Sequence, residues 1–230
     1  MTFKVIETGS SGNCFLFGKL MIDCGLPYSK IKDHVKPNVL LTHCHGDHFN
    51  NSTIRKLSTN HDVTFYALPY LCERLQTIGI DNFVAIEAGK VYQVGDYMVS
   101  PVTAYHDVEN VGYRIMYKSI KHFHITDTVT LEGITARNYT SASIECNHCE
   151  IAALQLIETA RQNGEFTHMT RAMNTHLSVQ KAIEFILEND IKNMTPIHIG
   201  ISTKDQVMYA LNQIRNKVNI EEEALKNEIH

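Results

Sequence analysis

The sequence predicts a single α/β domain in which β-strands are flanked by α-helices. The first part of the chain contains short apolar and alternating runs, whereas the last third has apolar residues at helical spacing. The 230 residues are 43% hydrophobic and 20% charged, as in ordinary soluble globular proteins. No repeat, linker or low-complexity segment divides the chain, so we expect one domain over residues 1–218 and a tail over residues 219–230.

Runs of three to eight residues bounded by turn residues predict most of the strands. The expected strands are residues 3–7, 14–17, 20–22, 38–41, 63–67, 83–86, 91–94, 97–104, 111–117, 121–126 and 141–145. Two helices interrupt this series, at residues 51–57 and 69–78, the second with Pro69 in its first turn and Gly79 as a cap. Residues 38–41 lack alternation, which predicts a strand buried on both faces.

Helical periodicity dominates after residue 148. Apolar residues spaced three or four apart predict a helix over residues 149–162. Two further helices are expected at residues 179–187 and 204–218, with a strand at residues 194–197 between them. The Glu-rich residues 219–230 predict a frayed helix or a mobile tail.

Composition excludes several classes of protein. No apolar stretch reaches the roughly 20 residues of a membrane helix, and the N-terminus lacks the pattern of a signal peptide. The six cysteines form no disulfide framework, and the pair Cys146 and Cys149 has no second pair to complete a zinc site. The net charge of −4 lacks the basic footprint of proteins that grip long nucleic acids. We therefore expect a cytoplasmic protein with no membrane partner.

Histidine carries the strongest chemical signal in the sequence. The chain has 13 histidines, and the run His43-Cys44-His45-Gly46-Asp47-His48 directly follows the apolar strand at residues 38–41. Two imidazoles two positions apart can converge on one metal ion, and Asp47 and His48 can turn toward a second. Two neighbouring ions suit the activation of water and the clamping of a phosphoryl or acyl oxygen.

This run is similar to the H-x-H-x-D-H signature of the metallo-β-lactamase superfamily, and the resemblance continues along nearly the whole chain. Residues 9–14 (Gly-Ser-Ser-Gly-Asn-Cys) and 22–25 (Ile-Asp-Cys-Gly) look like the opening strands of the YycJ/WalJ-type members. The resemblance implies the family's four-layer αββα sandwich. It also implies that His106, Asp127 and His198, each at a strand end, complete two metal sites.

Carried over residue by residue, the first ion is expected at His43, His45, His106 and Asp127. The second is expected at Asp47, His48, Asp127 and His198, with Asp127 bridging both. Zinc suits these donors best, although manganese, iron or nickel are compatible.

Two further segments resemble parts of phosphodiesterases. His176, before a predicted helix, looks like the histidine of ribonuclease Z that acts as a proton donor or transition-state contact, and a helix N-terminus also favours an anion. The alternative is a simple capping segment with Ser178 as the cap. Residues 145–148 (Glu-Cys-Asn-His) resemble a Glu-x-Asn-His element of the YycJ/WalJ group, although Cys149 stands where that group commonly has aspartate.

The expected substrate pocket consists of Ser10, Ser11, Asn147 and His148. Five further histidines are interpreted as surface or packing residues, namely His34, His61, His122, His124 and His168.

These features predict a two-metal phosphodiesterase in which Asp47 and His176 are catalytic. Two substrate classes stay open: cyclic nucleotide second messengers, or the ends of DNA or RNA as for YycJ/WalJ-type exonucleases. A glyoxalase II-like thioesterase is an alternative because it shares the bridging aspartate, and a non-catalytic nucleotide binder is another. Relatives commonly form dimers, so the resemblance implies a homodimer. A basic groove for nucleic acid would draw on Lys30, Lys32, Arg55, Lys56, Arg74, Arg171 and Lys181.

Overall fold

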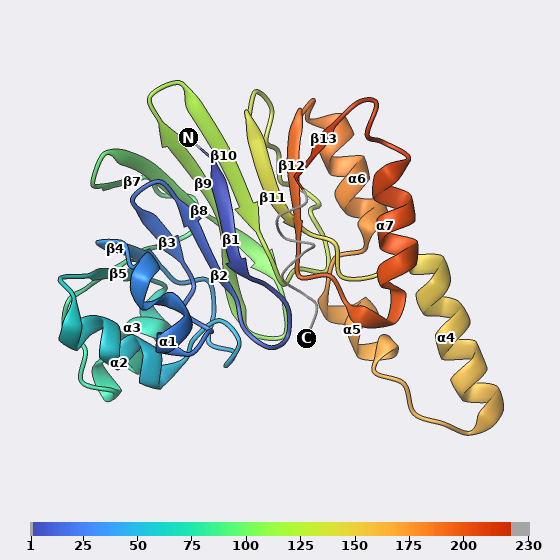
Figure 1. Cartoon of the computed structure of the whole chain (residues 1–230), viewed down its shortest axis with the longest axis horizontal. Coiled ribbons are helices and arrows are strands. Elements are labelled where there is room, and N and C mark those ends of the chain that lie inside the picture. Colours follow the sequence, from blue (N-terminus) through green and yellow to red (C-terminus); the bar gives the residue numbers. More distant parts are fainter. Residues whose placement is uncertain (1, 222–230) are drawn as a thin grey trace.

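The computed structural model describes residues 2–221, which fold into two mixed β-sheets with helices on both outer faces (Figure 1). The first sheet has the strand order β1-β2-β3-β4-β5-β6, and the second has the order β13-β12-β11-β10-β9-β8-β7. Helices α1 to α3 pack on the first sheet, whereas α6 and α7 pack on the second. The predicted four-layer αββα sandwich is therefore confirmed.

The element bounds agree closely with the sequence pattern. The strands of the first sheet are β1 (Phe3–Glu7), β2 (Cys14–Phe17), β3 (Leu20–Ile22), β4 (Asn38–Leu40), β5 (Thr64–Ala67) and β6 (Phe83–Ala85). Those of the second are β7 (Tyr92–Val94), β8 (Tyr97–Tyr105), β9 (Glu109–Tyr117), β10 (Ile120–Ile125), β11 (Ser141–Glu145), β12 (Asn193–Ile197) and β13 (Asn219–Ile220). The α-helices are α1 (Tyr28–Ile31), α2 (Asn51–Asn60), α3 (Pro69–Thr77), α4 (Glu150–Asn163), α5 (Met169–Thr175), α6 (Val179–Glu188) and α7 (Lys204–Asn212), and two 3₁₀ turns are η1 (Lys32–His34) and η2 (Ile201–Thr203).

Parallel strands in each sheet deliver the polar residues to one edge. Strands β3, β4 and β5 run parallel, and so do β10, β11 and β12. Because the carboxyl ends of parallel strands meet at the same edge, the loops that follow β4, β10 and β12 come together there. Local signals support the neighbouring helices: the Asn50 side chain caps α2, and the Ser178 side chain caps α6.

The core between the sheets is unusually aromatic. Phe3, Phe15 and Phe17 are buried there, and His122 stacks between two of them, with ring centroids 4.6 Å from Phe3 and 4.9 Å from Phe17. Neighbouring His124 is also fully buried. For these two histidines the packing interpretation is confirmed and the surface alternative is wrong, because they point from β10 into the sandwich.

The C-terminal prediction needs two corrections. Helix α7 ends at Asn212, not at residue 218, and residues 219–220 form β13, which pairs in parallel with β12. Val218 and Ile220 are buried in the core against α7, so tertiary packing overrides the polar local composition. The expected tail therefore does not begin at residue 219, and its residues 222–230 lie outside the described part. The short helices α1 and α5 were not predicted.

Over residues 2–221, none of the helices has the length and apolar character needed to cross a membrane.

Candidate metal centre

The seven residues expected to bind metal come together where the two sheets meet. His43, His45, Asp47 and His48 follow β4, and His106 follows β8. Asp127 and His198 follow β10 and β12 of the second sheet. Residues separated by 155 positions in the chain thus share one site because both sheets present strand ends to the same edge.

The first group of donors consists of His43, His45 and His106, whose ring nitrogens lie within 4.8 Å of one another. Nδ1 of His45 is 3.2 Å from Nε2 of His43 and 3.3 Å from Nε2 of His106. The opposite nitrogens are held elsewhere: His106 Nδ1 donates to the carbonyl of Thr175 at 2.8 Å, and His43 Nδ1 meets the Thr42 hydroxyl at 3.1 Å. Each ring therefore presents a fixed nitrogen to the centre.

The second group consists of Asp47, His48 and His198. Oδ2 of Asp47 is 3.4 Å from Nε2 of His48 and 3.6 Å from Nε2 of His198. Here carboxylates hold the opposite nitrogens, with Asp23 Oδ2 2.7 Å from His48 Nδ1 and Glu145 Oε1 3.1 Å from His198 Nδ1. A carboxylate behind an imidazole fixes its tautomer and increases its strength as a ligand.

Asp127 lies between the two groups. Its Oδ2 is 3.1 Å from Nε2 of His48, and its Oδ1 is 3.7 Å from Nε2 of His198 and 3.9 Å from Nε2 of His106. This position suits the bridging role that the resemblance implies.

Three residues of this site hold a left-handed backbone conformation, namely Asp23, Asp127 and His198, with φ of 60°, 53° and 54°. Such strain in non-glycine residues persists only where surrounding contacts enforce it. At Asp127 the enforcing contact is Asn110, whose side-chain nitrogen donates to the carbonyls of Thr126 and Asp127 at 3.0 and 2.7 Å.

Electrostatics make this centre attractive to positive charge. Burial, aided by neighbouring His48, holds the pKa of His43 well below its usual value, so the ring is neutral. Burial opposes the charge of Asp127, but His198 and His48 outweigh it and hold the carboxyl pKa well below its usual range. Burial likewise opposes the charge of His198, yet Asp127, Asp47 and Glu145 raise its pKa to about 10. Two buried anions thus attract positive charge to a pocket of imidazoles.

A divalent ion fits this arrangement. Nε2 of His198 is buried and has no hydrogen-bond partner among the described residues, although its ring faces Asp47 and Asp127. An orphaned buried nitrogen beside two carboxylates is the environment of a metal ligand. The nitrogen and oxygen donors suit zinc, manganese, iron or nickel.

His176 lies beside the ligands and is held by Glu145. Its Nδ1 is 2.7 Å from Glu145 Oε1 and 3.5 Å from Asp127 Oδ1, and its ring stacks on that of His198 at 5.1 Å. Burial disfavours its charged form, but Glu145 and then Asp127 outweigh this and raise the pKa of His176. Because Nδ1 faces Glu145, Nε2 is the nitrogen left to meet a substrate.

Sequence reasoning assigned no role to two buried carboxylates, Asp23 and Glu145. Both were within quoted motifs, and both lie at the end of a largely buried strand, as Asp127 does. An acidic residue at the carboxyl end of a buried strand is the signal that could have found them. Asp107 was also missed: its Oδ1 lies 3.4 Å from Nε2 of His45 and 3.2 Å from Nε2 of His106.

A cleft of about 940 Å³ opens onto the centre. Its walls are residues 7–11, residues 45–47, helix α5 and residues 198–203, and His106, Asp127, Asn147 and His176 also line it. The expected pocket residues Ser10, Ser11 and Asn147 are thus at the cleft. His148 is not among its lining residues: it is 2% exposed, and its backbone carbonyl accepts a hydrogen bond from Val179.

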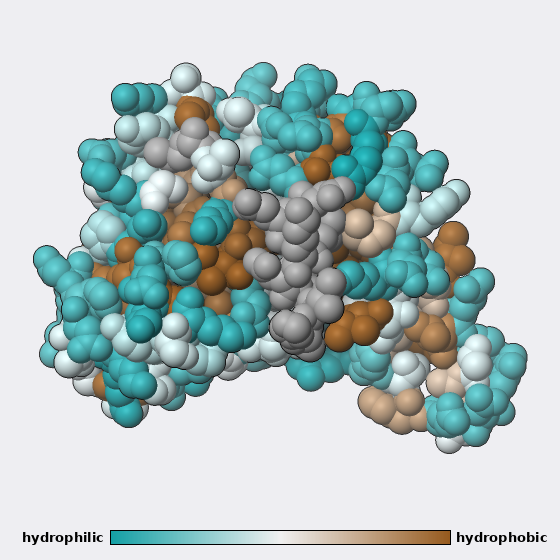
Figure 2. Space-filling model, viewed as in Figure 1, coloured by the Kyte–Doolittle hydropathy of each residue, from teal (hydrophilic) through white to brown (hydrophobic). Residues whose placement is uncertain are grey.

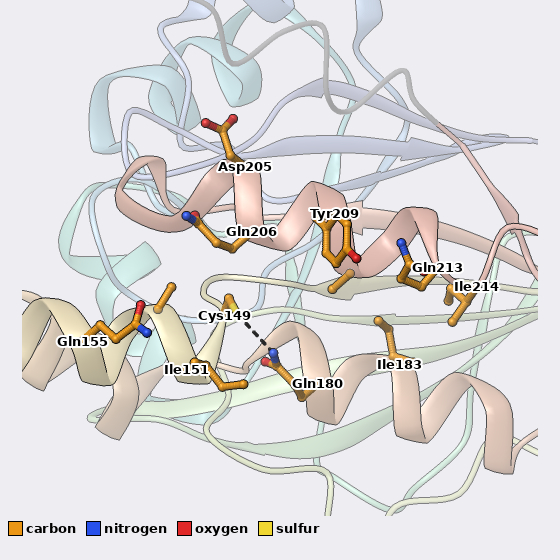
Figure 3. A pocket seen from close by; sticks show the side chains of 12 residues that line it. Cys149, Ile151, Gln155, Gln180, Ile183, Asp205, Gln206, Tyr209, Gln213 and Ile214 are labelled. Atoms are coloured by element: carbon orange, nitrogen blue, oxygen red, sulfur yellow. Dashed lines mark hydrogen bonds between the residues drawn. The ribbon is translucent and has the colours of Figure 1, made fainter.

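A separate apolar groove lies between α4, α6 and α7 (Figure 3). Ile151 and Tyr209 are exposed at its rim, and Figure 2 shows hydrophobic surface over this part of the molecule. Cys149 lies in the groove, where its sulfur accepts a hydrogen bond from Gln180 at 3.1 Å. Cys146 and Cys149 belong to none of the possible metal-binding groups found among the described residues.

Comparison with known proteins gives the family. A family model described as the beta-lactamase superfamily domain matches residues 25–199. The chain therefore belongs to that family, and it has the metallo-β-lactamase fold. No curated protein matches the chain.

Solved structures agree on the fold. The metallo-β-lactamase fold protein YhfI from Bacillus subtilis is 17% identical, with a TM-score of 0.74 and 95% of each chain covered. Zn²⁺-bound PqqB from Methylobacterium extorquens is 12% identical, with a TM-score of 0.73 and coverage of 96% of this chain and 97% of that one. The short form of human tRNase Z is 13% identical, with a TM-score of 0.65 and 96% of each chain covered. At these identities the likeness shows the fold alone.

Proposed function

We propose that this protein is a metal-dependent phosphodiesterase that hydrolyses small nucleotides, with cyclic nucleotides as the expected class. The observation that carries the proposal is the Glu145–His176 pair beside the ligand cluster, with Nδ1 and Oε1 2.7 Å apart. It adds a potential proton donor to a centre built to bind cations. One similar structure is named tRNase Z, which supports phosphodiester cleavage as chemistry that this fold can carry out.

Two divalent ions, when bound, would lower the pKa of an attacking water and neutralise charge on the phosphoryl oxygens. His43, His45 and His106 would hold one ion, Asp47, His48 and His198 the other, and Asp127 lies where it can contact both. Asp47 also lines the cleft, where its carboxylate can orient the water.

His176 supplies the proton for the leaving group. Glu145 raises the pKa of His176 and so favours its protonated ring, with Glu145 holding Nδ1 and leaving Nε2 to donate. Glu145 also accepts hydrogen bonds from the backbone N–H groups of Thr128 and Leu177, both at 3.0 Å, so this carboxylate is rigidly placed. After His176 has given its proton to the leaving oxygen, the next water molecule that enters the site would protonate the ring again.

A proton donor distinguishes a phosphodiester from a thioester. The alcohol leaving group of a nucleotide is a strong base and departs slowly unless it is protonated. A thiolate is far less basic, since an ordinary thiol has a pKa of about 8.5, and leaves without such help. The Glu145–His176 pair therefore favours phosphodiesters over the thioesterase alternative.

The charge of the cleft favours a small substrate over a polymer. Of the seven basic residues considered for a groove, only Lys30 and Arg171 line the cleft. Each is already paired with a carboxylate: Lys30 with Glu7 at 2.6 Å and Arg171 with Asp107 at 2.9 Å. Polymer binding relies on many cations free to contact successive phosphates.

The test is a substrate panel for the metal-loaded protein, containing linear DNA, RNA, cyclic mononucleotides and cyclic dinucleotides. Cleavage of cyclic nucleotides with intact polymers is the expected result. Degradation of the polymers alone would make the protein a nuclease and overturn the small-nucleotide assignment. The homodimer and the cytoplasmic location expected from the sequence stay predictions.

A further inference from the structure

A hydrogen-bonded chain through Thr8 and Asn13 connects ligands that belong to opposite sheets. The backbone N–H of His198 donates to the Thr8 hydroxyl at 2.9 Å, and that hydroxyl donates to Asn13 Oδ1 at 3.0 Å. At the other end, Asn13 Nδ2 lies 3.3 Å from Asp47 Oδ2 and 2.8 Å from His48 Nε2. Thr8 is 3% exposed and Asn13 is completely buried, so water does not compete for these contacts.

The direction of each hydrogen bond in this series is fixed by which groups can donate. The Thr8 oxygen accepts from His198, so its single hydrogen is free for Asn13. Oδ1 of Asn13 also accepts from the backbone N–H of Gly9 at 2.9 Å, so two donors require an oxygen at that position. The amide of Asn13 therefore cannot be reversed without leaving buried donors unpaired, and its Nδ2 must face Asp47 and His48.

The pair holds two members of one ligand group and lies beside the third. His198 is held through its backbone and Asp47 through Nδ2 of Asn13, whereas Nε2 of His48, whose lone pair would bind the ion, lies next to that amide. The backbone is held as well, because Asn13 N donates to the carbonyl of Asp47 at 2.7 Å. Within residues 2–221, no hydrogen bond found for the two side chains leads to His43, His45 or His106.

The left-handed conformation of His198 gives this contact a mechanical role. With φ of 54°, the residue needs outside contacts to hold its backbone, and the hydrogen bond from its N–H to Thr8 is one of them. Thr8 follows β1 in the first sheet, whereas His198 follows β12 in the second. The hydrogen bonds through Thr8 and Asn13 thus fix the separation of Asp47, which follows a strand of the first sheet, and His198, which follows a strand of the second.

We propose that Thr8 and Asn13 are positioning residues that set the affinity of the site formed by Asp47, His48 and His198, and leave the site of His43, His45 and His106 largely unchanged. The inference rests on the two-ion centre of the proposed function. It goes beyond that function because it proposes that a loop of the first sheet sets the affinity for one of the two ions and not for the other.

The matched variants are Thr8→Val and Thr8→Ser. Valine has nearly the shape of threonine but offers His198 no acceptor and Asn13 no donor, whereas serine keeps both. Asn13→Asp is the second variant, because it keeps an acceptor oxygen for Thr8 and replaces the amide nitrogen, which donates toward Asp47, with an anionic oxygen.

The measurement is calorimetric titration of the metal-free full chain with Zn²⁺, repeated with Co²⁺ while the visible absorption bands of each site are followed. Wild type and Thr8→Ser are expected to bind two ions. Thr8→Val and Asn13→Asp are expected to bind the first ion with unchanged affinity and the second at least tenfold more weakly, with a changed cobalt spectrum for that site alone.

Wild-type affinity for both ions in Thr8→Val would overturn the inference. Equal weakening of both ions in the two variants, or loss of the folded state in both, would also overturn it, because the pair would then only shape the loop. A wild-type protein that binds fewer than two ions would instead contradict the two-ion centre of the proposed function.

Discussion

Buried Glu145 and half-buried His176 form a carboxylate–imidazole pair, with Oε1 of Glu145 2.7 Å from Nδ1 of His176. The same Oε1 lies 3.1 Å from Nδ1 of His198. One carboxylate oxygen thus orients both a metal ligand and the candidate proton donor. This shared support couples ion binding to proton transfer in the proposed enzyme.

Replacing Glu145 with glutamine is expected to lower kcat by about 100-fold, the scale of lost general acid catalysis. Glu145 Oε1 faces two ring nitrogens and Oε2 accepts from two backbone N–H groups, so the amide of glutamine must turn its own N–H groups against one of these pairs of donors. Steady-state kinetics of Glu145→Gln and His176→Ala, alone and combined, measure the effect. Strictly additive losses in the double variant would count against the coupling. Glu150→Gln is the control, because Glu150 accepts a hydrogen bond from Ser178 outside the cleft.

Asp23→Asn is expected to weaken ion binding by 10–100-fold, the usual effect of removing a carboxylate behind a histidine ligand. Asp23 is completely buried and accepts from His48 Nδ1 and from the backbone N–H and hydroxyl of Thr42. Competition with a fluorescent zinc chelator gives the affinity. Asp96→Asn, an exposed change far from the centre, should have no effect. Unaltered zinc affinity in Asp23→Asn would show that His48 is not a ligand.

Removal of bound metal is expected to abolish activity and to lower Tm by on the order of 5–10 °C for ion at 100-fold above its Kd. Without an ion, the carboxylates of Asp47 and Asp127 and the imidazoles around them lose their shared partner. Differential scanning calorimetry with and without a chelator tests this, and restoring zinc or manganese should reverse both effects. If the Tm were the same with and without the chelator, the centre would bind no ion.

His122 is expected to make the fold sensitive to acid. Burial lowers its pKa from 6.5 to about 3. Below pH 6.5 the unfolded chain therefore takes up a proton that the folded chain refuses until about pH 3. The contribution of His122 is complete above pH 6.5 and falls by roughly 1.4 kcal/mol per pH unit as the pH drops through this window.

Urea unfolding of the metal-free protein at several pH values measures this slope. His122→Gln should be less stable near neutral pH, because it loses stacking on Phe3 and Phe17, but it should lose less stability between pH 6 and pH 4. His34→Gln, in the 3₁₀ turn η1, is the matched control. An identical acid slope in wild type and His122→Gln would refute the prediction.

The fold was largely predictable because its signals are local. Strands such as β2 and β4 are short apolar runs, and α3 has proline in its first turn and a left-handed glycine after its end. β13 was missed because it contains only two residues, polar Asn219 and a single apolar Ile220. They form a strand because they pair with β12 and because Ile220 packs in the core with α7. Helix α5 was missed for a similar reason, since one buried residue, Met169, anchors it.

The site was predictable only where one segment carries several ligands. The run from His43 to His48 signals metal by itself, whereas His106, Asp127 and His198 became ligand candidates through family resemblance. The supports Asp23, Glu145 and Asn13 have no such spacing, because each meets a ligand in another loop of the same sheet that is far away in sequence. Their roles follow from tertiary geometry that a single sequence does not contain.

The most direct test of the central claim compares two phosphodiesters with the metal-loaded wild type and His176→Ala. One is a cyclic nucleotide, whose alcohol leaving group needs a proton. The other is bis-p-nitrophenyl phosphate, whose leaving group departs without one. The account predicts that wild type hydrolyses both, and that His176→Ala loses about 100-fold or more on the nucleotide but little on the p-nitrophenyl ester. Equal losses on both would contradict the role of His176, and no turnover of either by wild type would contradict the phosphodiesterase itself.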